Sequence, residues 1–523
     1  MSSTDERPEG TRSVGRAAAP SNSSVGGNMQ GSDSSEADDA STPLLQHSST
    51  AQEPTTKRTR SFCRLFIPLL LLALLISFFH DHLPWLTPDD KATSLLPPST
   101  LTNGTHTFSR TVILISLDGA KPSYLNTSLA PHLSSLGTST PHSRRAQYMQ
   151  PIFPTLTFPN HWSLLTGLYA SSHGIVANDF TDASTGEQFY YTSPDKSWDA
   201  GWWGGEPVWA TAERSGVNTA VLMWPGPPVT AAGITPRYFQ KYESGPEWNL
   251  NGRLRQVLRW IDVESVEERP SLICAYVPDI DQAAHRFGPE STQAMKALKD
   301  VDAFIGSLQT QLEERALSKV VDLVIVSDHG MTTTSNSKLI YLDDLLGDSL
   351  YPKLKHRDGW PSAGLRFQGT LSEQYDFEQQ ALHHLSHLPK EGWTVYTRST
   401  LPSRYHLASP AVEDRLVPVW IIPDLGWSIT THQEMRTFEH GVYAPRGNHG
   451  YDNEQMDMQA IFVATGPSFS PLAGTEGKGW NLNGFGNVEI HNLVSRILGV
   501  TERKRAPTNG TWTFWDRHLR SGL

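Results

Sequence analysis

Three uninterrupted apolar runs, each followed by acidic residues, constrain the fold of this 523-residue chain more than any other feature. They are TVILISLDG (111–119), SLICAYVPDID (271–281) and VVDLVIVSDHG (320–330). Strands that are apolar along their whole length are typical of parallel sheets, which are buried on both faces. Helical patterns lie between them, as in GRLRQVLRWIDVE and TQAMKALKDVDAFIGSLQTQLEE. The alternation predicts a doubly wound α/β fold with a mostly parallel sheet.

The polar residues that follow these runs should gather at one edge of the sheet, beyond the carboxyl ends of the strands. The expected cluster comprises Asp118, Asp281, His285, Asp328, His329 and, from the loop GNHGYDN, His449. Each residue alone has an ordinary interpretation as a turn residue, a helix cap or an exposed side chain. Clustered carboxylates, however, repel one another unless a cation binds them. Oxygen and imidazole ligands suit zinc, with manganese or another divalent metal as alternatives.

Six such ligands are too many for one catalytic zinc ion and suit two metal ions with three ligands each. Two metals roughly 3.5–4 Å apart can clamp the attacking and leaving oxygens of a phosphoryl transfer. That chemistry suggests a role for Thr157, which lies in the segment PTLTFPNHWSLLTG (154–167). A hydroxyl is a poor nucleophile until a metal favours its alkoxide. Without such a partner, Thr157 would only stabilise a turn.

The chain resembles the nucleotide pyrophosphatase/phosphodiesterase family, within the alkaline phosphatase superfamily, in six segments that occur in the family's order. The segments are PTLTFPNHWSLLTGLYASSHGIVAN, GEPVWATAERSGV, MWPG, DQAAHRFGP, VSDHGM and GNHGYDN. The resemblance implies an alkaline-phosphatase-like fold. It also implies hydrolysis of nucleotide pyrophosphate and phosphodiester bonds through a nucleotidyl-threonine intermediate, with release of nucleoside 5′-monophosphates.

The same resemblance implies roles for individual residues, with Zn²⁺ as the expected metal at both sites. The ligands of the metal beside the nucleophile are matched by Asp118, Thr157, Asp328 and His329, and those of the second metal by Asp281, His285 and His449. Asn178 matches the asparagine that donates a hydrogen bond to a non-bridging phosphate oxygen. Phe158 matches the aromatic residue that stacks on the nucleobase, and Tyr276 another aromatic residue of that pocket.

Some matched positions carry other expectations. Leu156 stands where many members have lysine, which leaves the substrate preference open. His161 and His173 lie inside matched segments, and we expect each to pack or to support a ligand rather than bind metal. The cysteine-rich modules and nuclease-like domain of larger animal members have no counterpart in this sequence, so a single catalytic domain is expected.

Other activities remain as alternatives. A sulfatase needs a C/S-x-P-x-R motif, which residues 154–167 lack. A phosphomonoesterase usually needs a further cation for the terminal phosphate, and no clear candidate is visible. Hydrolysis of lipid or choline phosphodiesters, which some relatives perform, is a third alternative. A fourth is a catalytically inactive protein that keeps the fold for surface binding. The presence of Thr157 and all six ligands argues against the inactive alternative.

The first 60 residues are rich in Ser, Thr, Gly and Asp and predict a disordered tail. KRTRSFCRLFIPLLLLALLISFFHDH follows, and it predicts a transmembrane signal anchor over residues 62–82. It begins too far along the chain for a cleaved signal peptide, although a buried core helix is an alternative. Basic residues precede the apolar run and acidic residues follow it, which predicts a type II membrane protein with a cytosolic N-terminus.

The rest of the chain should then be extracellular or lie in the lumen of the secretory or vacuolar system. We expect a stalk over 83–107 and a catalytic domain over 108–523, with a smaller cap or insertion over 340–440. Asn103, Asn126 and Asn509 lie in glycosylation sequons. A net charge of −11 argues against binding to nucleic-acid duplexes. Two cysteines provide no disulfide framework, and Cys274 is expected in the core.

Overall fold

The computed structural model of the chain describes residues 100–472 and 480–521. The predicted tail (1–60) and membrane anchor (62–82) lie outside the described residues. Within the described part, no helix combines the length and apolarity that a membrane crossing requires. The end of the range predicted as a stalk, 83–107, forms an antiparallel hairpin of β1 (Leu101–Thr102) and β2 (Thr107–Phe108).

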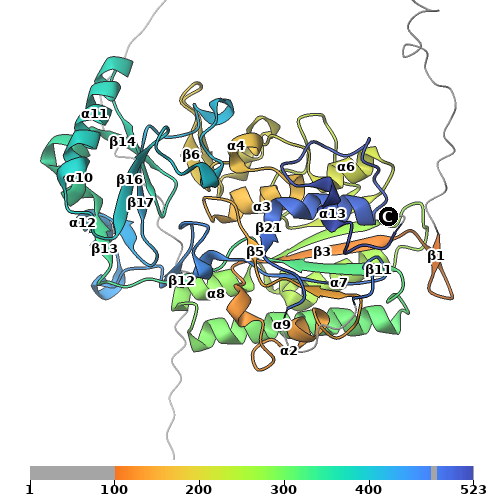
Figure 1. The fold of residues 1–523 in the computed structure, drawn as a ribbon. Coiled ribbons are helices and arrows are strands. Elements are labelled where there is room, and N and C mark those ends of the chain that lie inside the picture. Colours follow the sequence, from red (N-terminus) through yellow and green to blue (C-terminus); the bar gives the residue numbers. More distant parts are fainter. Residues whose placement is uncertain (1–99, 473–479, 522–523) are drawn as a thin grey trace, which may run out of the picture. The chain divides into compact units, whose positions relative to one another are not determined.

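A seven-stranded sheet forms the centre of the molecule, in the order β4-β20-β11-β3-β10-β8-β9 (Figure 1). Its strands are β3 (Thr111–Leu117), β4 (Ser143–Arg145), β8 (Thr219–Leu222), β9 (Tyr238–Gln240), β10 (Leu272–Val277), β11 (Val321–Val326) and β20 (Phe462–Thr465). The five strands from β11 to β9 are mutually parallel, and β20 runs antiparallel to both of its neighbours. The predicted α/β fold with a mostly parallel sheet is thereby confirmed.

Helices cover both faces of this sheet (Figure 1). One face carries α3 (Thr157–Thr166), α6 (Val208–Arg214) and α13 (Ile490–Ile497). The other carries α2 (Pro131–Leu136), α7 (Leu250–Ile261) and α9 (Thr292–Glu314). The bounds of α9 are those that its helical pattern predicts.

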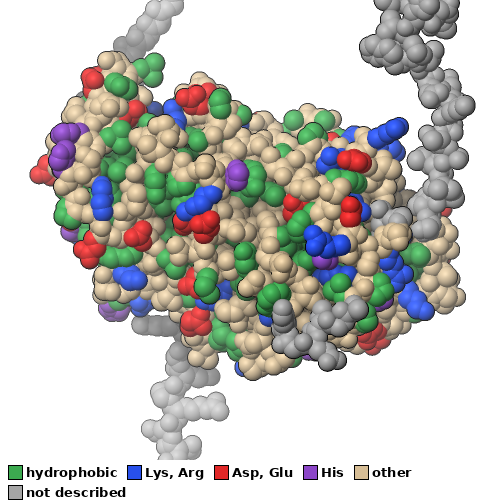
Figure 2. All heavy atoms as spheres, viewed as in Figure 1, with side chains coloured by type: hydrophobic (Ala, Val, Ile, Leu, Met, Phe, Trp, Pro, Cys, Tyr) green, Lys and Arg blue, Asp and Glu red, His purple; other side chains and the backbone are tan. Residues whose placement is uncertain are grey.

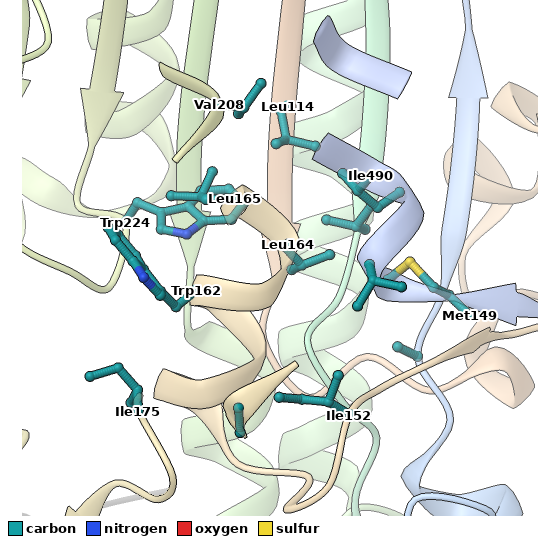
Figure 3. Packing of buried hydrophobic residues seen from close by; sticks show 14 of the residues in the cluster. Leu114, Met149, Ile152, Trp162, Leu164, Leu165, Ile175, Val208, Trp224 and Ile490 are labelled. Carbon is teal, nitrogen blue, oxygen red and sulfur yellow. The ribbon is translucent and has the colours of Figure 1, made fainter. Parts of the chain in front are cut away.

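Two hydrophobic cores lie between these layers, because successive residues of a strand point to opposite faces. Val112 and Leu114 of β3 belong to the core under α3 and α13. Ile113 and Ile115 of the same strand belong to the core under α7 and α9. Figure 3 shows part of the first core, where Leu164 and Leu165 lie near Leu114, Ile490 and Val208. Both faces of β3 are therefore apolar, as its sequence predicts. Cys274 is also fully buried.

A second, smaller sheet lies beside the first and has its own core (Figure 1). Its order is β14-β15-β17-β16, all antiparallel, and its strands are β14 (Leu354–Asp358), β15 (Ala363–Phe367), β16 (Trp393–Thr397) and β17 (Val419–Pro423). The parallel pair β13 (Leu339–Tyr341) and β18 (Ser428–Thr430) adjoins it, with helices α10 (Leu342–Leu350), α11 (Leu371–His387) and α12 (His432–Met435). Apart from Leu339, these elements lie within residues 340–440, the range for which the sequence predicts a cap or insertion.

The structure also contains short helices and two-stranded pairs outside the two sheets. They are α4 (Ala170–His173), α5 (Pro194–Ser197) and the pairs β5 (Met149–Gln150) with β21 (Phe485–Gly486), β6 (Asp179–Thr181) with β7 (Gln188–Tyr190), and β12 (Thr332–Thr333) with β19 (Gly447–Asn448). On the surface shown in Figure 2, acidic and basic side chains are interspersed rather than gathered in patches of one sign.

Candidate active site

The acidic residues of the three apolar runs meet because β3 lies between β11 and β10 in the sheet. Leu117 pairs with Val277, and Ser116 with Val326, so the three strands end almost level. Asp118 directly follows β3, and Asp328 comes two residues after the end of β11. Asp281 lies in α8 (Asp279–Phe287), the helix that begins soon after β10. The site therefore forms at a topological switch point of the sheet.

Gly119 allows two of these acids to approach each other. Its φ of +71° lies in the left-handed region, which side chains disfavour. A Cβ atom there would lie 3.1 Å from Cβ of Asp281. The Asp-Gly sequence that ends β3 is thus required by the close packing of the β3 and β10 ends.

His449 returns to this edge through a short strand pair. Thr332 and Thr333 of β12, just beyond Asp328 and His329, pair with Asn448 and Gly447 of β19. His449 directly follows β19, so this pairing places its ring beside that of His329. The predicted cluster of three aspartates and three histidines is therefore brought together in the structure.

All three histidines of the cluster use Nδ1 in the same way. Nδ1 of His285 lies 2.8 Å from the carbonyl oxygen of Gly447, Nδ1 of His329 lies 2.9 Å from that of Gly330, and Nδ1 of His449 lies 2.9 Å from that of Thr155. A carbonyl oxygen only accepts hydrogen bonds, so each Nδ1 carries a proton. In its neutral form, each ring therefore presents the lone pair of Nε2 to the cluster, which is the arrangement of metal-binding histidines.

One group of potential ligands consists of Asp118, Asp328 and His329, all buried. Nε2 of His329 lies 3.0 Å from Oδ2 of Asp328 and 3.5 Å from Oδ1 of Asp118. Oγ1 of Thr157 lies 3.3 Å from the same Nε2. The threonine hydroxyl thus lies at the edge of this group.

A second group consists of Asp281, His329 and His449, and His285 adjoins it. Oδ1 of Asp281 lies 3.3 Å from Nε2 of His285 and 3.6 Å from Nε2 of His449. The Nε2 atoms of His285 and His449 are 3.0 Å apart. Two lone pairs at this separation repel each other unless a proton or a cation lies between them.

Several oxygens of the cluster lack a donor. Within residues 100–472 and 480–521, no hydrogen bond reaches the buried atoms Oδ1 of Asp118, Oδ1 of Asp281 or Oδ2 of Asp328. Buried charged oxygens are costly unless a cation or a donor satisfies them. The number and chemistry of these atoms fit divalent metal ions.

The electrostatics of the carboxylates point the same way. Burial, followed by the charges of Asp328 and Asp281, raises the pKa of Asp118 well above its usual range. Burial also disfavours ionised Asp328, but His329 and His161 outweigh it and hold its pKa well below the usual range. A protein without a cation could not keep all three carboxylates ionised here, whereas a bound metal would favour their charged forms.

Thr157 is the first residue of helix α3, whose N-cap is Leu156. Helix N-termini carry a partial positive charge and bind phosphate groups well. Oδ1 of Asn178 accepts a hydrogen bond from the backbone N–H of Phe158, at 2.9 Å. This hydrogen bond to the oxygen fixes the orientation of the Asn178 carboxamide, so that its N–H₂ group can donate to a ligand. Leu156 is buried near Gly450, so its side chain is not part of the polar cluster.

Aromatic side chains surround the approach to Thr157. The ring of Phe158 lies 5.3 Å from that of Tyr191, which is partly exposed. Tyr276 is mostly buried, and its hydroxyl donates to Oδ2 of Asp118. The more exposed ring of Tyr242 lies 6.3 Å from that of Tyr276. A planar ligand would therefore meet Phe158, Tyr191 and Tyr242 more readily than Tyr276.

The family model described as type I phosphodiesterase/nucleotide pyrophosphatase matches residues 112–452, which hold the whole cluster. The chain belongs to this family. An uncharacterized pyrophosphatase/phosphodiesterase of Schizosaccharomyces pombe is 39% identical over 415 residues, which are 78% of this chain and 80% of that protein. Human ectonucleotide pyrophosphatase/phosphodiesterase family member 1 is 34% identical over 76% of this chain, and the match spans only 40% of that longer relative.

Solved structures of nucleotide pyrophosphatases/phosphodiesterases share the fold. Human ectonucleotide pyrophosphatase/phosphodiesterase 5 superposes with a TM-score of 0.67 at 28% identity, covering 79% of this chain and 100% of that chain. An inactive threonine-to-alanine variant of the murine protein, in complex with AMP, superposes with a TM-score of 0.65 at 27% identity and covers 78% of this chain and 100% of that chain.

Sequence reasoning missed two aromatic residues beside the site of this family member. Tyr191 and Tyr242 carry no motif, and only their position beside Phe158 and Tyr276 singles them out. His161 was expected to support a ligand, and its Nδ1 lies 3.2 Å from Oδ2 of Asp328 and 2.8 Å from the carbonyl oxygen of Thr157. His173 lies elsewhere, with Nε2 3.0 Å from Oγ of Ser163.

Proposed function

We propose that this family member hydrolyses nucleotide pyrophosphate and phosphodiester bonds in a metal-dependent reaction that releases nucleoside 5′-monophosphates. One observation carries the proposal: the Thr157 hydroxyl lies 3.3 Å from Nε2 of His329, at the start of α3 and at the edge of a buried carboxylate–imidazole cluster. The names of the relatives, and the AMP complex of a murine relative, support a nucleotide-derived substrate.

Two divalent metal ions, with Zn²⁺ as the expected species, fit the cluster. Asp118, Thr157, Asp328 and His329 would hold one ion, and Asp281, His285 and His449 the other. When bound, the ions would supply Lewis acidity toward the phosphate oxygens and would lower the pKa of hydroxyl groups beside them.

Thr157 is the proposed nucleophile. Its Oγ1 loses its proton to solvent and attacks the α-phosphorus, so that a new P–O bond forms. The bond to the leaving group, which is pyrophosphate or an alcohol oxygen, breaks on the opposite side of the phosphorus. The resulting nucleotidyl-threonine ester is then hydrolysed by water, which releases the nucleoside monophosphate and restores the hydroxyl. The inactive threonine-to-alanine variant of the murine relative supports a threonine in this role.

Asn178 is proposed to stabilise the transition state. Its amide oxygen is held by the Phe158 N–H, so its N–H₂ group can donate to a non-bridging phosphate oxygen. A preorganised donor of this kind acts where negative charge develops. The N-terminus of α3, with its backbone N–H groups, adds a favourable field at the same phosphate.

The nucleobase is proposed to stack on Phe158, with Tyr191 and Tyr242 nearby. Aromatic faces also attract quaternary ammonium groups, so the same residues favour choline phosphodiesters as a second candidate substrate class.

We also propose that residues 62–82 anchor the protein as a type II membrane protein, with the catalytic residues extracellular or lumenal.

Assays with four different substrates would test the proposal. The full chain would be purified in detergent with zinc and assayed with a chromogenic thymidine 5′-monophosphate ester, ATP, a chromogenic choline phosphodiester and a simple aryl phosphate. We expect fastest turnover of the two nucleotide substrates, with nucleoside monophosphate as product. Tyr242→Ala should raise KM for the thymidine ester but not for a base-free aryl phosphodiester.

A higher kcat/KM for the choline ester would favour the second candidate. Preference for the aryl phosphate monoester would contradict both. A mock preparation from host cells that lack the protein, purified in parallel, shows whether any turnover comes from a contaminant.

A further inference from the structure

The hairpin of β14 and β15 in the smaller sheet reaches the segment that carries Asn178. At its turn, the backbone N–H of Gly359 donates to the carbonyl oxygen of Asp179 at 3.0 Å and to Oδ2 of the same residue at 3.2 Å. Asp179 is the residue directly after Asn178 and the first residue of β6. The smaller sheet therefore contacts the proposed catalytic segment through one hydrogen bond between main-chain groups and one to a side chain.

Asp358 and Arg366, from the two strands of this hairpin, hold the other end of β6. Asp358 is only 3% exposed, and its carboxylate accepts hydrogen bonds from the N–H of Thr181 at 3.0 Å and from the Thr181 hydroxyl at 3.3 Å. Nε of Arg366 donates to the same carboxylate at 2.7 Å, and Nη2 donates to the carbonyl oxygen of Thr181 at 2.6 Å. The ion pair thus satisfies both backbone polar groups of Thr181, much as a neighbouring strand would.

Asn178 connects the segment held by the hairpin to the segment that carries the proposed nucleophile, Thr157. Its carbonyl oxygen accepts from the N–H of Tyr191 at 3.1 Å, and its side-chain oxygen accepts from the N–H of Phe158, next to Thr157, at 2.9 Å. The backbone on its C-terminal side is held by the hairpin through Asp179 and Thr181. A shift of β6 would consequently move the Asn178 amide relative to the Thr157 hydroxyl.

We propose that Asp358 is a positioning residue for catalysis, which acts by holding Asn178 in register with Thr157. The smaller sheet then contributes to catalysis by positioning Asn178, although it provides none of the proposed metal ligands. This inference rests on the role given to Asn178 in the proposed function.

The hairpin also provides a matched control. Arg357 precedes Asp358 on β14, so its side chain points to the opposite face of the sheet. Nη2 of Arg357 pairs with Oε1 of Glu434 at 2.8 Å, and neither residue has a hydrogen bond to β6 or to Asn178 among the described contacts. Glu434→Gln weakens this ion pair between β14 and α12, keeps the Arg357 charge that acts on Asp179, and removes no hydrogen bond of the Asn178 segment.

The experiment is a double-mutant cycle on the full chain. Asp358→Asn keeps the shape of the side chain but removes the charge that pairs with Arg366. Because a misplaced donor acts mainly in the transition state, we expect kcat to fall by about 10- to 100-fold with KM changed little. Zinc content and the melting temperature would be measured alongside. Glu434→Gln should keep wild-type kcat.

The coupling to Asn178 decides the outcome. In an Asn178→Ala background, Asp358→Asn should have almost no further effect on kcat, because the group that it positions is gone. An equal loss in both backgrounds, or wild-type kcat in the single variant, would overturn the inference and leave the proposed function intact. A neutral Asn178→Ala would instead remove Asn178 from the proposed mechanism, and the inference with it.

A second variant covers the case in which Asp358→Asn does not fold. Arg366→Lys keeps the positive charge but loses the fork that bonds Asp358 and Thr181 together. It should show the same dependence on Asn178. Independence from Asn178 in this variant would contradict the inference.

Discussion

The imidazole rings of His329 and His449 stack with their centroids 3.6 Å apart and their planes 16° apart. His329 belongs to both groups of potential metal ligands, so this stack joins the two halves of the cluster. Two charged imidazolium rings would repel at this distance. Burial, followed by the charges of His329 and His285, lowers the pKa of His449 well below its usual range. A neutral His449 is the form that binds a metal.

Thr157→Ala should reduce turnover of a nucleoside monophosphate ester by several orders of magnitude, since it removes the proposed nucleophile. Thr157→Ser should keep a measurable fraction because the oxygen remains. Single-turnover rates at saturating zinc, with folding checked by circular dichroism, make the comparison. Near wild-type rates in the Ala variant would assign the attack to another group, and the hydroxyl would then only stabilise the start of α3.

Asp281→Ala should lower metal content and rate together, because it removes a proposed ligand. Zinc per chain would be measured by mass spectrometry after dialysis at several fixed concentrations of free zinc. Asp343→Ala provides the control: Asp343 also lies within a carboxylate–histidine group, with Asp344 of α10 and His432 of α12, beside the smaller sheet. Unchanged zinc content in Asp281→Ala would contradict a metal bound by Asp281, whereas zinc loss in Asp343→Ala would indicate a further ion at the Asp343 group.

Asp179 should make the protein less stable as the pH rises. Burial, followed by the charge of Asp358, raises its pKa to about 7. Between the unfolded value of 3.8 and about 7, the folded state binds more protons than the unfolded state, so the free energy of unfolding falls with increasing pH. The contribution should be on the order of a few kcal/mol, because each pKa unit corresponds to about 1.4 kcal/mol.

Asp179→Asn isolates this contribution from that of other groups. Denaturant unfolding at pH 5 and pH 8 should give a smaller difference in stability for the variant than for the wild type. An identical difference in both proteins would show that the Asp179 carboxyl has an ordinary pKa. Zinc should be kept saturating at both pH values, so that metal loss does not add to the difference.

Asn509 should carry most of the N-linked glycan if the catalytic residues are lumenal. Its side chain is exposed and bonds through its oxygen, which accepts from the N–H of Tyr169 at 2.9 Å. The side-chain nitrogens of Asn103 and Asn126 instead donate within the fold, to the carbonyl oxygens of Arg315 and Ser123. Glycan is attached to this nitrogen, which leaves Asn509 as the most accessible sequon.

Gel mobility before and after glycosidase treatment would measure this. Asn509→Gln should remove most of the shift of the full chain made in a eukaryotic host. Asn22→Gln is the matched control, because its sequon lies before the predicted anchor. A shift that depends on Asn22 would reverse the predicted topology.

Local sequence determined the elements of the main sheet. The apolar runs became β3, β10 and β11 because residues apolar along a whole strand can be buried only between two layers. Asp118 and Asp328 follow β3 and β11, and Asp281 lies in the helix after β10, so the acidic edge of the sheet followed from the order of the residues. The DQAAH spacing placed Asp281 and His285 on one face of α8, since residues four apart are neighbours on a helix.

Only the tertiary structure decided which distant segments meet at that edge. His449 reaches His329 through the β12–β19 pair, and Tyr191 and Tyr242 reach Phe158 and Tyr276 through turns without regular periodicity. The hydrogen bonds of Asp358 to Thr181 join the smaller sheet to the separate β6–β7 pair. Periodicity reports which face of its own element a residue occupies, whereas these contacts depend on how separate elements pack. For that reason the strands and their acidic ends could be predicted, and the partners of those ends could not.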